Sequence, residues 1–123
     1  MERTKQTFTG KHSCQGEFMS RKKEIREMAN LIGNSAAHIA LLPDSEFAQK
    51  EASTYTEDAS ETAACRTWTE REINDFKELA KRRAISELKE RIKKYGLSEK
   101  QLDDFVARAE KYISAFVANH MVG

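Results

Sequence analysis

The pattern of apolar and polar residues predicts two amphipathic helices in the second half of the chain. Apolar residues recur there at steps of three and four, a spacing that places them on one helical face. Burial of each large side chain contributes roughly 1.5–3 kcal/mol, so we expect the two faces to pack together. The first face comprises Ile73, Phe76, Ala80, Ala84, Leu88, Ile92 and Tyr95, and the second comprises Leu102, Phe105, Val106, Ala109, Tyr112, Ile113, Phe116 and Val117.

Local signals place the ends of these two helices. Thr69 is followed three residues later by Glu72, and Ser98 three residues later by Gln101, which is the spacing of a capping box at a helix start. Gly96 stands where a helix commonly ends in a left-handed residue. The sequence therefore predicts helices over residues 70–95 and 99–120 that are joined by a tight turn and run antiparallel.

The first half of the chain predicts a further helix over residues 20–42. Ser20 can cap it, and apolar residues from Ile25 to Ile32 form its face. The sequence Gly-Asn-Ser at residues 33–35 interrupts this pattern, so we expect a bend or break there. Residues 36–42 are apolar on every side except at His38. Pro43 ends the helix, because it disfavours helical geometry in the residue before it.

A fourth helical segment is predicted over residues 45–66, with Asp44 or Ser45 as its cap. Its apolar face consists mainly of small residues, which permit close approach of a neighbouring helix. The residues expected to point inward are Phe47, Ala48, Ala52, Tyr55, Ala59 and Ala63.

Together these segments predict an all-α protein. Short connections make successive helices antiparallel, so the expected fold is a four-helix bundle with up-down-up-down topology. Residues 18–123 are expected to form a single helical-bundle domain. Residues 1–17 are polar and lack periodicity, which indicates an irregular or disordered N-terminal segment.

Composition adds an expectation about location. The chain has 123 residues with two cysteines, too few for a disulfide framework. No apolar run approaches the roughly 18 residues of a membrane span, and the N-terminus has no signal-peptide pattern. We therefore expect a cytoplasmic protein that does not enter a membrane.

Charge is distributed unevenly although the net charge is only +1. Residues 31–65 hold six acids and one lysine, whereas residues 66–100 hold eleven basic residues and seven acids. One interpretation is attraction between an acidic and a basic helix inside one bundle. The other is a basic face that binds an acidic partner.

The sequence contains none of the common catalytic motifs. There is no glycine-rich phosphate loop, no GxSxG, no HExxH and no CxxC, and no histidine follows a glutamate at the spacing that di-iron bundles use. His12, Cys14 and Cys65 offer soft metal ligands, but not at a known zinc spacing. We expect no enzyme activity, no cofactor, no catalytic residue and no metal site.

His38 could form a site with acids of the next helix, namely Glu57, Asp58 and Glu61. In antiparallel helices joined at Pro43, however, His38 lies level with Lys50, roughly 10 Å from Glu57 at 1.5 Å per residue. The sequence therefore favours a hydrogen-bonded histidine in the core over a shared polar site. Trp68, before the Thr69 cap, is expected to pack on Ile73 as a hydrophobic staple.

Two surfaces are candidates for binding. A four-helix bundle covers about half of each helix, so the apolar run should remain partly exposed at Ala37, His38, Leu41 and Leu42. These residues predict contact with a protein partner or a second copy in a homodimer, unless the N-terminal segment covers them through Phe8 and Phe18. Lys81, Arg82, Lys89 and Lys93 form the best basic cluster, which gives the alternative of a nucleic-acid-binding accessory protein.

Protein–protein contact is the function that the sequence favours. The basic residues of segment 70–95 scatter round most of the helix, and several have an acid four residues earlier. No aromatic residue stands among the four for stacking on bases. Nucleic-acid binding is therefore the alternative, and the expected protein is a small helical protein that acts through contacts with other proteins.

Overall fold

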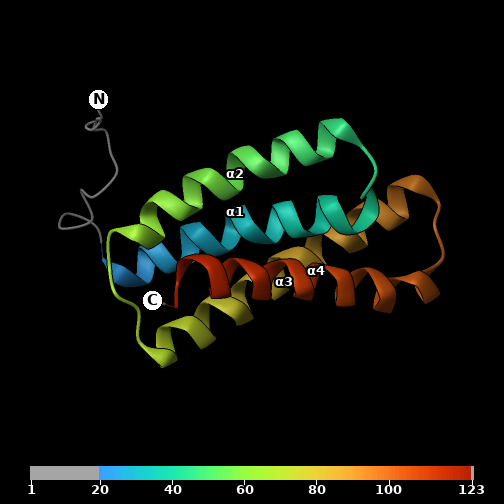
Figure 1. The fold of residues 1–123 in the computed structure, drawn as a ribbon. Helices are drawn as coiled ribbons and strands as arrows, with labels where there is room; N and C mark the ends of the chain where they lie inside the picture. Colours follow the sequence, from blue (N-terminus) through green and yellow to red (C-terminus); the bar gives the residue numbers. More distant parts are fainter. Residues whose placement is uncertain (1–19, 123) are drawn as a thin grey trace.

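The computed structural model describes residues 20–122, which form an all-α bundle (Figure 1). The α-helices are α1 (Arg21–Leu41), α2 (Glu46–Ala64), α3 (Glu70–Tyr95) and α4 (Leu102–His120). A single 3-10 turn, η2 (Glu99–Gln101), precedes α4. These bounds lie within two residues of the predicted segments at nearly every end, so the predicted fold class is confirmed. The predicted irregular segment, residues 1–17, lies outside the described residues.

The helices run up, down, up and down along the bundle axis, and α1 is the helix that organises the others (Figure 1). It packs against α2, α3 and α4, whereas α2 makes little contact with α3. All four helices contribute to one apolar core, in which Met28, Ile32, Phe76 and Leu88 are almost fully buried. The Phe76 and Phe116 rings meet there with centroids 5.5 Å apart.

Capping side chains begin three of the helices. The Ser20 hydroxyl accepts a hydrogen bond from the Lys23 amide at 3.1 Å, and the Ser45 hydroxyl accepts one from the Ala48 amide at 3.2 Å. At Thr69 the full capping box with Glu72 is present, as predicted. These contacts satisfy backbone amides that have no partner within the helix.

The start of α4 differs from the predicted capping box. The Ser98 hydroxyl accepts from the Lys100 amide at 3.1 Å, not from the amide of Gln101. The physical reason is the η2 turn, because a 3-10 turn is wound more tightly than an α-helix and brings an earlier amide to the cap. The predicted box at Ser98 was therefore wrong, although Ser98 is the cap.

Of the predicted bend or break at residues 33–35, the break is wrong, since α1 is continuous from Arg21 to Leu41. Gly33 is buried against α3, and a Cβ built on it would lie 2.6 Å from the Cβ of Arg83. The glycine therefore serves close approach between two helices and does not interrupt one.

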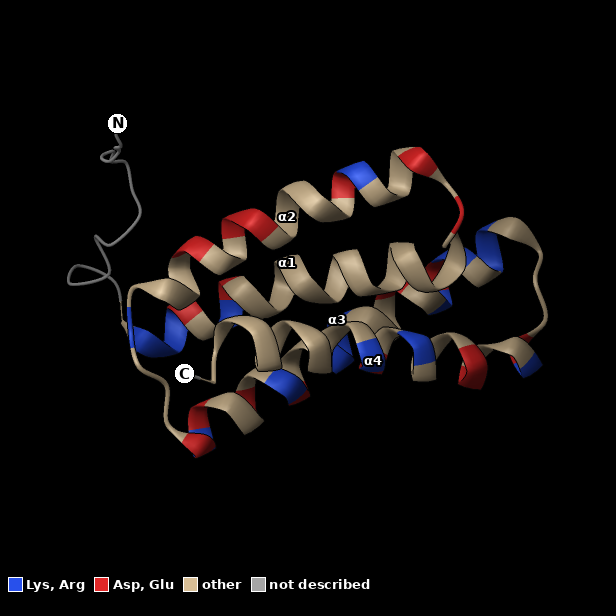
Figure 2. Ribbon diagram, viewed as in Figure 1, with Lys and Arg blue, Asp and Glu red and all other residues tan. Residues whose placement is uncertain are grey.

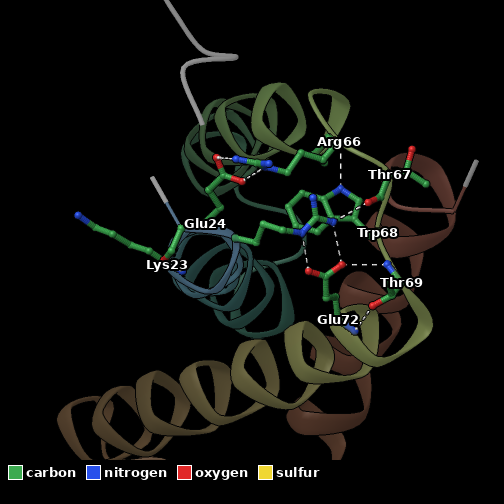
Figure 3. Close-up of polar contacts among 10 residues, drawn as sticks. Lys23, Glu24, Arg66, Thr67, Trp68, Thr69 and Glu72 are labelled. Atoms are coloured by element: carbon green, nitrogen blue, oxygen red, sulfur yellow. Dashed lines mark hydrogen bonds and ion pairs between the residues drawn. The ribbon is translucent and has the colours of Figure 1, made fainter. Parts of the chain in front are cut away.

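The corner between α2 and α3 is fixed to the start of α1 by charged side chains (Figure 3). Arg21 binds both carboxylate oxygens of Glu72, at 2.8 and 2.9 Å, and also donates to the Thr67 carbonyl at 2.7 Å. Arg66 pairs with the buried carboxylate of Glu24. Bidentate arginine–carboxylate pairs are geometrically specific, so this corner has one well-defined arrangement.

Trp68 completes the same corner (Figure 3). Its side chain is buried, its indole nitrogen donates to the Ala63 carbonyl at 2.9 Å, and the Arg21 guanidinium lies 5.2 Å from its ring centroid. The interpretation of Trp68 as a structural residue fits this position. Its predicted packing on Ile73 stays a prediction. Within residues 20–122, no helix combines the length and apolar character needed to cross a membrane.

Candidate functional site

The apolar run of residues 36–42 is more deeply buried than the sequence predicted. Ala36, Ala37 and Ala40 are no more than 2% exposed, and Leu41 is half-buried. The reason is that α2, α3 and α4 all pack against α1, so more of its circumference is covered than the expected half. A partner cannot contact the Ala37 side chain in this structure, because it is buried. Of the apolar candidate residues, Leu42 is the exposed one.

Large apolar side chains are instead exposed at one end of the bundle, the end that holds both the α1–α2 turn and the α3–α4 turn (Figure 1). We name this surface the apolar end. Its members are Leu42, Phe47, Tyr95 and Leu97, which are 43%, 73%, 49% and 38% exposed. Among residues 20–122 the remaining large apolar side chain with comparable exposure is Val122, at the opposite end.

Phe47 and Tyr95 were expected to point inward, and both expectations were wrong. The buried residues of α2 are Ala48, Ala52, Ala59 and Ala63. At 100° per residue, Phe47 projects well to one side of the line through these alanines. The spacing of the alanines is thus the signal that could have revealed an outward Phe47. Tyr95 is the last residue of α3, beyond the reach of the helices that cover Ile92.

The α1–α2 turn holds Phe47 in place at the start of α2. Pro43 ends α1, the Ser45 hydroxyl caps α2, and the Gln49 side chain donates to the Pro43 carbonyl at 2.6 Å. These bonds stabilise the first turn of the helix, so the exposed ring stands on a fixed backbone. Asp44 and Glu46 are exposed beside it in the sequence, and the exposed Lys50 lies one helical turn further on, so the surroundings of this aromatic group carry a small excess of negative charge.

The α3–α4 turn forms the other part of the apolar end. Gly96 has a positive φ, as predicted, with a value of 68°. The Leu97 amide donates to the Ile92 carbonyl at 2.9 Å, which is the bond of a Schellman motif that spans six residues. Beside this turn lies a cleft of about 570 Å³. Its lining residues are Lys89, Ile92, Lys93, Leu97, Glu99 and Leu102. The lining is therefore half apolar, and its charged residues leave a small excess of positive charge.

His38 lies near the same end but faces inward, between α1, α2 and α3. Its Nδ1 is 2.9 Å from a carboxylate oxygen of Glu51, so it is level with residues 50 and 51 and not with Glu57, as predicted. Burial is the main cause that lowers the pKa of His38, and Arg91 lowers it further against the opposing effect of Glu51 and Glu87. This arrangement is a structural link between helices.

The cluster of four basic residues on α3 is partly neutralised. Lys81 pairs with Glu110 of α4 at 3.1 Å, and Arg82 lies 3.7 Å from Glu78. Lys89 and Lys93 lie about two and three turns further on, where both line the cleft. Basic and acidic residues are interspersed along the sequence of α3, and Figure 2 shows both kinds on the visible parts of that helix.

The acidic charge of α2 is not paired with α3. Among residues 20–122, ion pairs between helices join α1 to α3 and α3 to α4, and none joins α2 to α3. The contact between α1 and α2 at His38 and Glu51 involves an imidazole whose pKa is lowered. Figure 2 shows the acids of α2 along its outer side. Since α1 packs against both helices, the predicted attraction between an acidic and a basic helix is not realised as direct contact inside the bundle.

The described residues hold no group of three or more histidine, cysteine, aspartate or glutamate side chains placed to bind a metal ion. Cys65 is disulfide-bonded, so its sulfur is not a free thiolate ligand. His12 and Cys14, the other members of the candidate metal set, lie outside the described residues.

Comparison with known proteins gives no relative for this chain: no family model, no curated protein and no solved structure matches it. The function must therefore be argued from the geometry of the bundle alone.

Proposed function

We propose that this protein acts through protein–protein contact and that the apolar end is the surface that makes it. The observation that carries the proposal is Phe47, an aromatic side chain that is 73% exposed on a well-capped helix. Covering such a ring contributes roughly 1.5–3 kcal/mol, which the bundle by itself does not use. Aromatic residues are enriched at protein interfaces for this reason.

The neighbouring residues support the same function. Leu42 and Phe47 flank the α1–α2 turn, and Tyr95 and Leu97 flank the α3–α4 turn, so two separate connections present apolar groups at one end. Gathered apolar exposure of this kind marks contact surfaces more often than single exposed residues do. The contact surface proposed here retains Leu42 from the predicted set and adds three residues that the sequence analysis had not assigned to it.

Site-specific photo-crosslinking tests this function. The photoreactive residue benzoylphenylalanine replaces Phe47, and irradiation is carried out in the cells that make the protein. The matched control carries the same residue at Thr54, which is also exposed on α2 but lies two turns away. We expect a discrete protein adduct at position 47 that is absent at position 54. Equal adducts at both positions, or none at position 47, would contradict the proposal.

A further inference from the structure

The cleft beside the α3–α4 turn and the Phe47 side chain have complementary properties. The cleft is lined by the apolar residues Ile92, Leu97 and Leu102 together with two lysines and one glutamate, which leaves a small excess of positive charge. Phe47 is an exposed apolar ring, and the acidic residues Asp44 and Glu46 accompany it. An aromatic group with flanking acids therefore fits an apolar cleft with flanking lysines, in both hydrophobicity and charge.

Both features lie at the same end of one chain. The last turns of α1 contact both α3 and α4 near this end. His38 lies near Glu87 and Arg91 of α3. Arg108 of α4 donates a hydrogen bond to the Ala40 carbonyl at 3.2 Å. In a two-fold symmetric pair, each contact between chains occurs twice with the roles exchanged. Two copies that meet at their apolar ends can thus each supply a ring and a cleft.

From this complementarity we propose that the partner of the apolar end is a second copy of the same chain. Phe47 of one copy enters the cleft between α3 and α4 of the other, and Glu46 of the first copy lies against Lys89 and Lys93 of the second. The inference rests on the proposed function, since it names the partner of the same surface. It differs from the homodimer predicted at residues 36–42, whose alanines are buried within each bundle.

The proposed contact is small, since it uses a few side chains from two turns. Interfaces at the lower end of the size range are weak, so we expect a dimer dissociation constant on the order of 10–100 µM. Glu99 also lines the cleft and reduces its positive charge. The acidic contribution from Glu46 is therefore expected to tune the pairing while the Phe47 ring provides most of its affinity.

Sedimentation velocity of the purified full chain, from about 5 to 500 µM, measures this association. We expect a monomer–dimer equilibrium that Phe47→Ala weakens at least about tenfold. The matched control is Val122→Ala, which removes an exposed apolar side chain at the opposite end and should leave the equilibrium unchanged. A chain that stays monomeric at about 500 µM overturns the inference.

Charge reversal tests the pairing itself. Glu46→Lys and Lys93→Glu should each weaken the homodimer, because each places like charges at both symmetric contacts. An equimolar mixture of the two variants should recover most of the lost affinity, since the two reversed charges then face each other across one contact and the unchanged Glu46 and Lys93 face each other across the other, while Lys89 still opposes the charge reversed at position 46. Lys77→Glu, on the same helix but outside the cleft, is the matched control and should change nothing.

The outcomes separate this inference from the function on which it rests. If the mixture does not recover the dimer, the reciprocal pairing is wrong. If the full chain is monomeric while position 47 still crosslinks to another protein, the apolar end binds a different partner and only the inference fails. If position 47 yields no specific adduct at all, the proposed function fails as well.

Discussion

Gly33 of α1 lies so close to Ala80 of α3 that a Cβ built on the glycine would be 2.7 Å from the Ala80 carbonyl oxygen. That contact lies in the interface between the two helices that pack most extensively. It explains why a residue that weakens helices occupies the middle of α1, because no other residue type would let the two backbones approach as closely.

The first prediction follows from this contact. Gly33→Ala should destabilise the protein by about 1–3 kcal/mol, because the added methyl group overpacks the α1–α3 interface. Helix propensity acts in the opposite direction by about 1 kcal/mol, so a net loss isolates the packing effect. Urea unfolding followed by circular dichroism provides the measurement, with the exposed Asn30→Ala as control. A Gly33→Ala variant more stable than the wild type would refute the close approach.

Gly96 gives a second prediction with a different cause. Nothing lies within 4 Å of a Cβ built there, but its φ of 68° is strained for any residue with a side chain. Gly96→Ala should cost about 1 kcal/mol, and Gly96→Asn should cost less because asparagine tolerates the left-handed region. Urea midpoints of the two variants measure this order, and an unchanged midpoint for Gly96→Ala would reject the left-handed turn.

Glu72 provides a prediction about acid stability. Hydrogen bonds from Arg21, followed by that from the Thr69 amide, hold the pKa of the Glu72 carboxyl at about 2, below its usual 4.5. The unfolded chain then binds the proton more readily than the folded one. The stabilisation is complete above about pH 4.5 and is lost as the pH falls toward 2.

Urea unfolding of the wild type and of Glu72→Gln between pH 2 and pH 7 tests this dependence. The wild type should be more stable at neutral pH by on the order of 1 kcal/mol, since Arg21 is partly exposed and solvent screens the pair. The difference should shrink toward zero as the pH approaches 2. A difference that is constant with pH would contradict the assigned ion pair.

His38 gives a second pH dependence, near neutrality. Its lowered pKa means that the unfolded chain takes up a proton more readily than the native imidazole, which faces Glu51 of α2 and Glu87 and Arg91 of α3. Its contribution to stability is therefore present above pH about 6.5 and is lost as the pH falls below it. The thermal unfolding midpoint of the wild type should therefore fall between pH 7.5 and 5.5, and His38→Gln should reduce that fall. A wild-type midpoint that rises on acidification would disprove the assignment.

Nucleic-acid binding, the alternative function, has its own test. Because Lys81 and Arg82 already have acidic partners, we expect no binding tighter than about 10 µM at about 150 mM salt. Fluorescence anisotropy with a short labelled duplex and a single strand measures this. Tight binding that weakens steeply with salt and is lost on replacing Lys81, Arg82, Lys89 and Lys93 would favour the alternative.

Periodicity and capping residues predicted the helices well, because those signals are local. The starts of α1, α2 and α3 follow from Ser20, Ser45 and Thr69, and the end of α3 follows from Gly96. Packing between helices that are far apart in the sequence has no such local signal. The continuity of α1 through Gly33 depends on the approach of α3, some 50 residues later, which no local pattern in α1 reveals.

The candidate site was predicted only in part, for the same reason. The apolar run of residues 36–42 predicted a patch near the α1–α2 turn that includes Leu42, but the burial of Ala37 depends on how many helices cover α1. Phe47 was assigned to the core because hydrophobicity alone favours burial of a phenylalanine. Only the positions of the four buried alanines determine which side of α2 faces α1.

If Phe47 belongs to the proposed contact surface, its side chain contributes nothing to the core. Urea unfolding of Phe47→Ser, beside Phe116→Ser, measures this directly. We predict that Phe47→Ser changes the free energy of unfolding by no more than about 0.5 kcal/mol, whereas Phe116→Ser, which removes a buried ring, costs at least about 3 kcal/mol. A decrease of more than about 2 kcal/mol in the free energy of unfolding for Phe47→Ser would place the ring in the core and contradict the proposed contact surface.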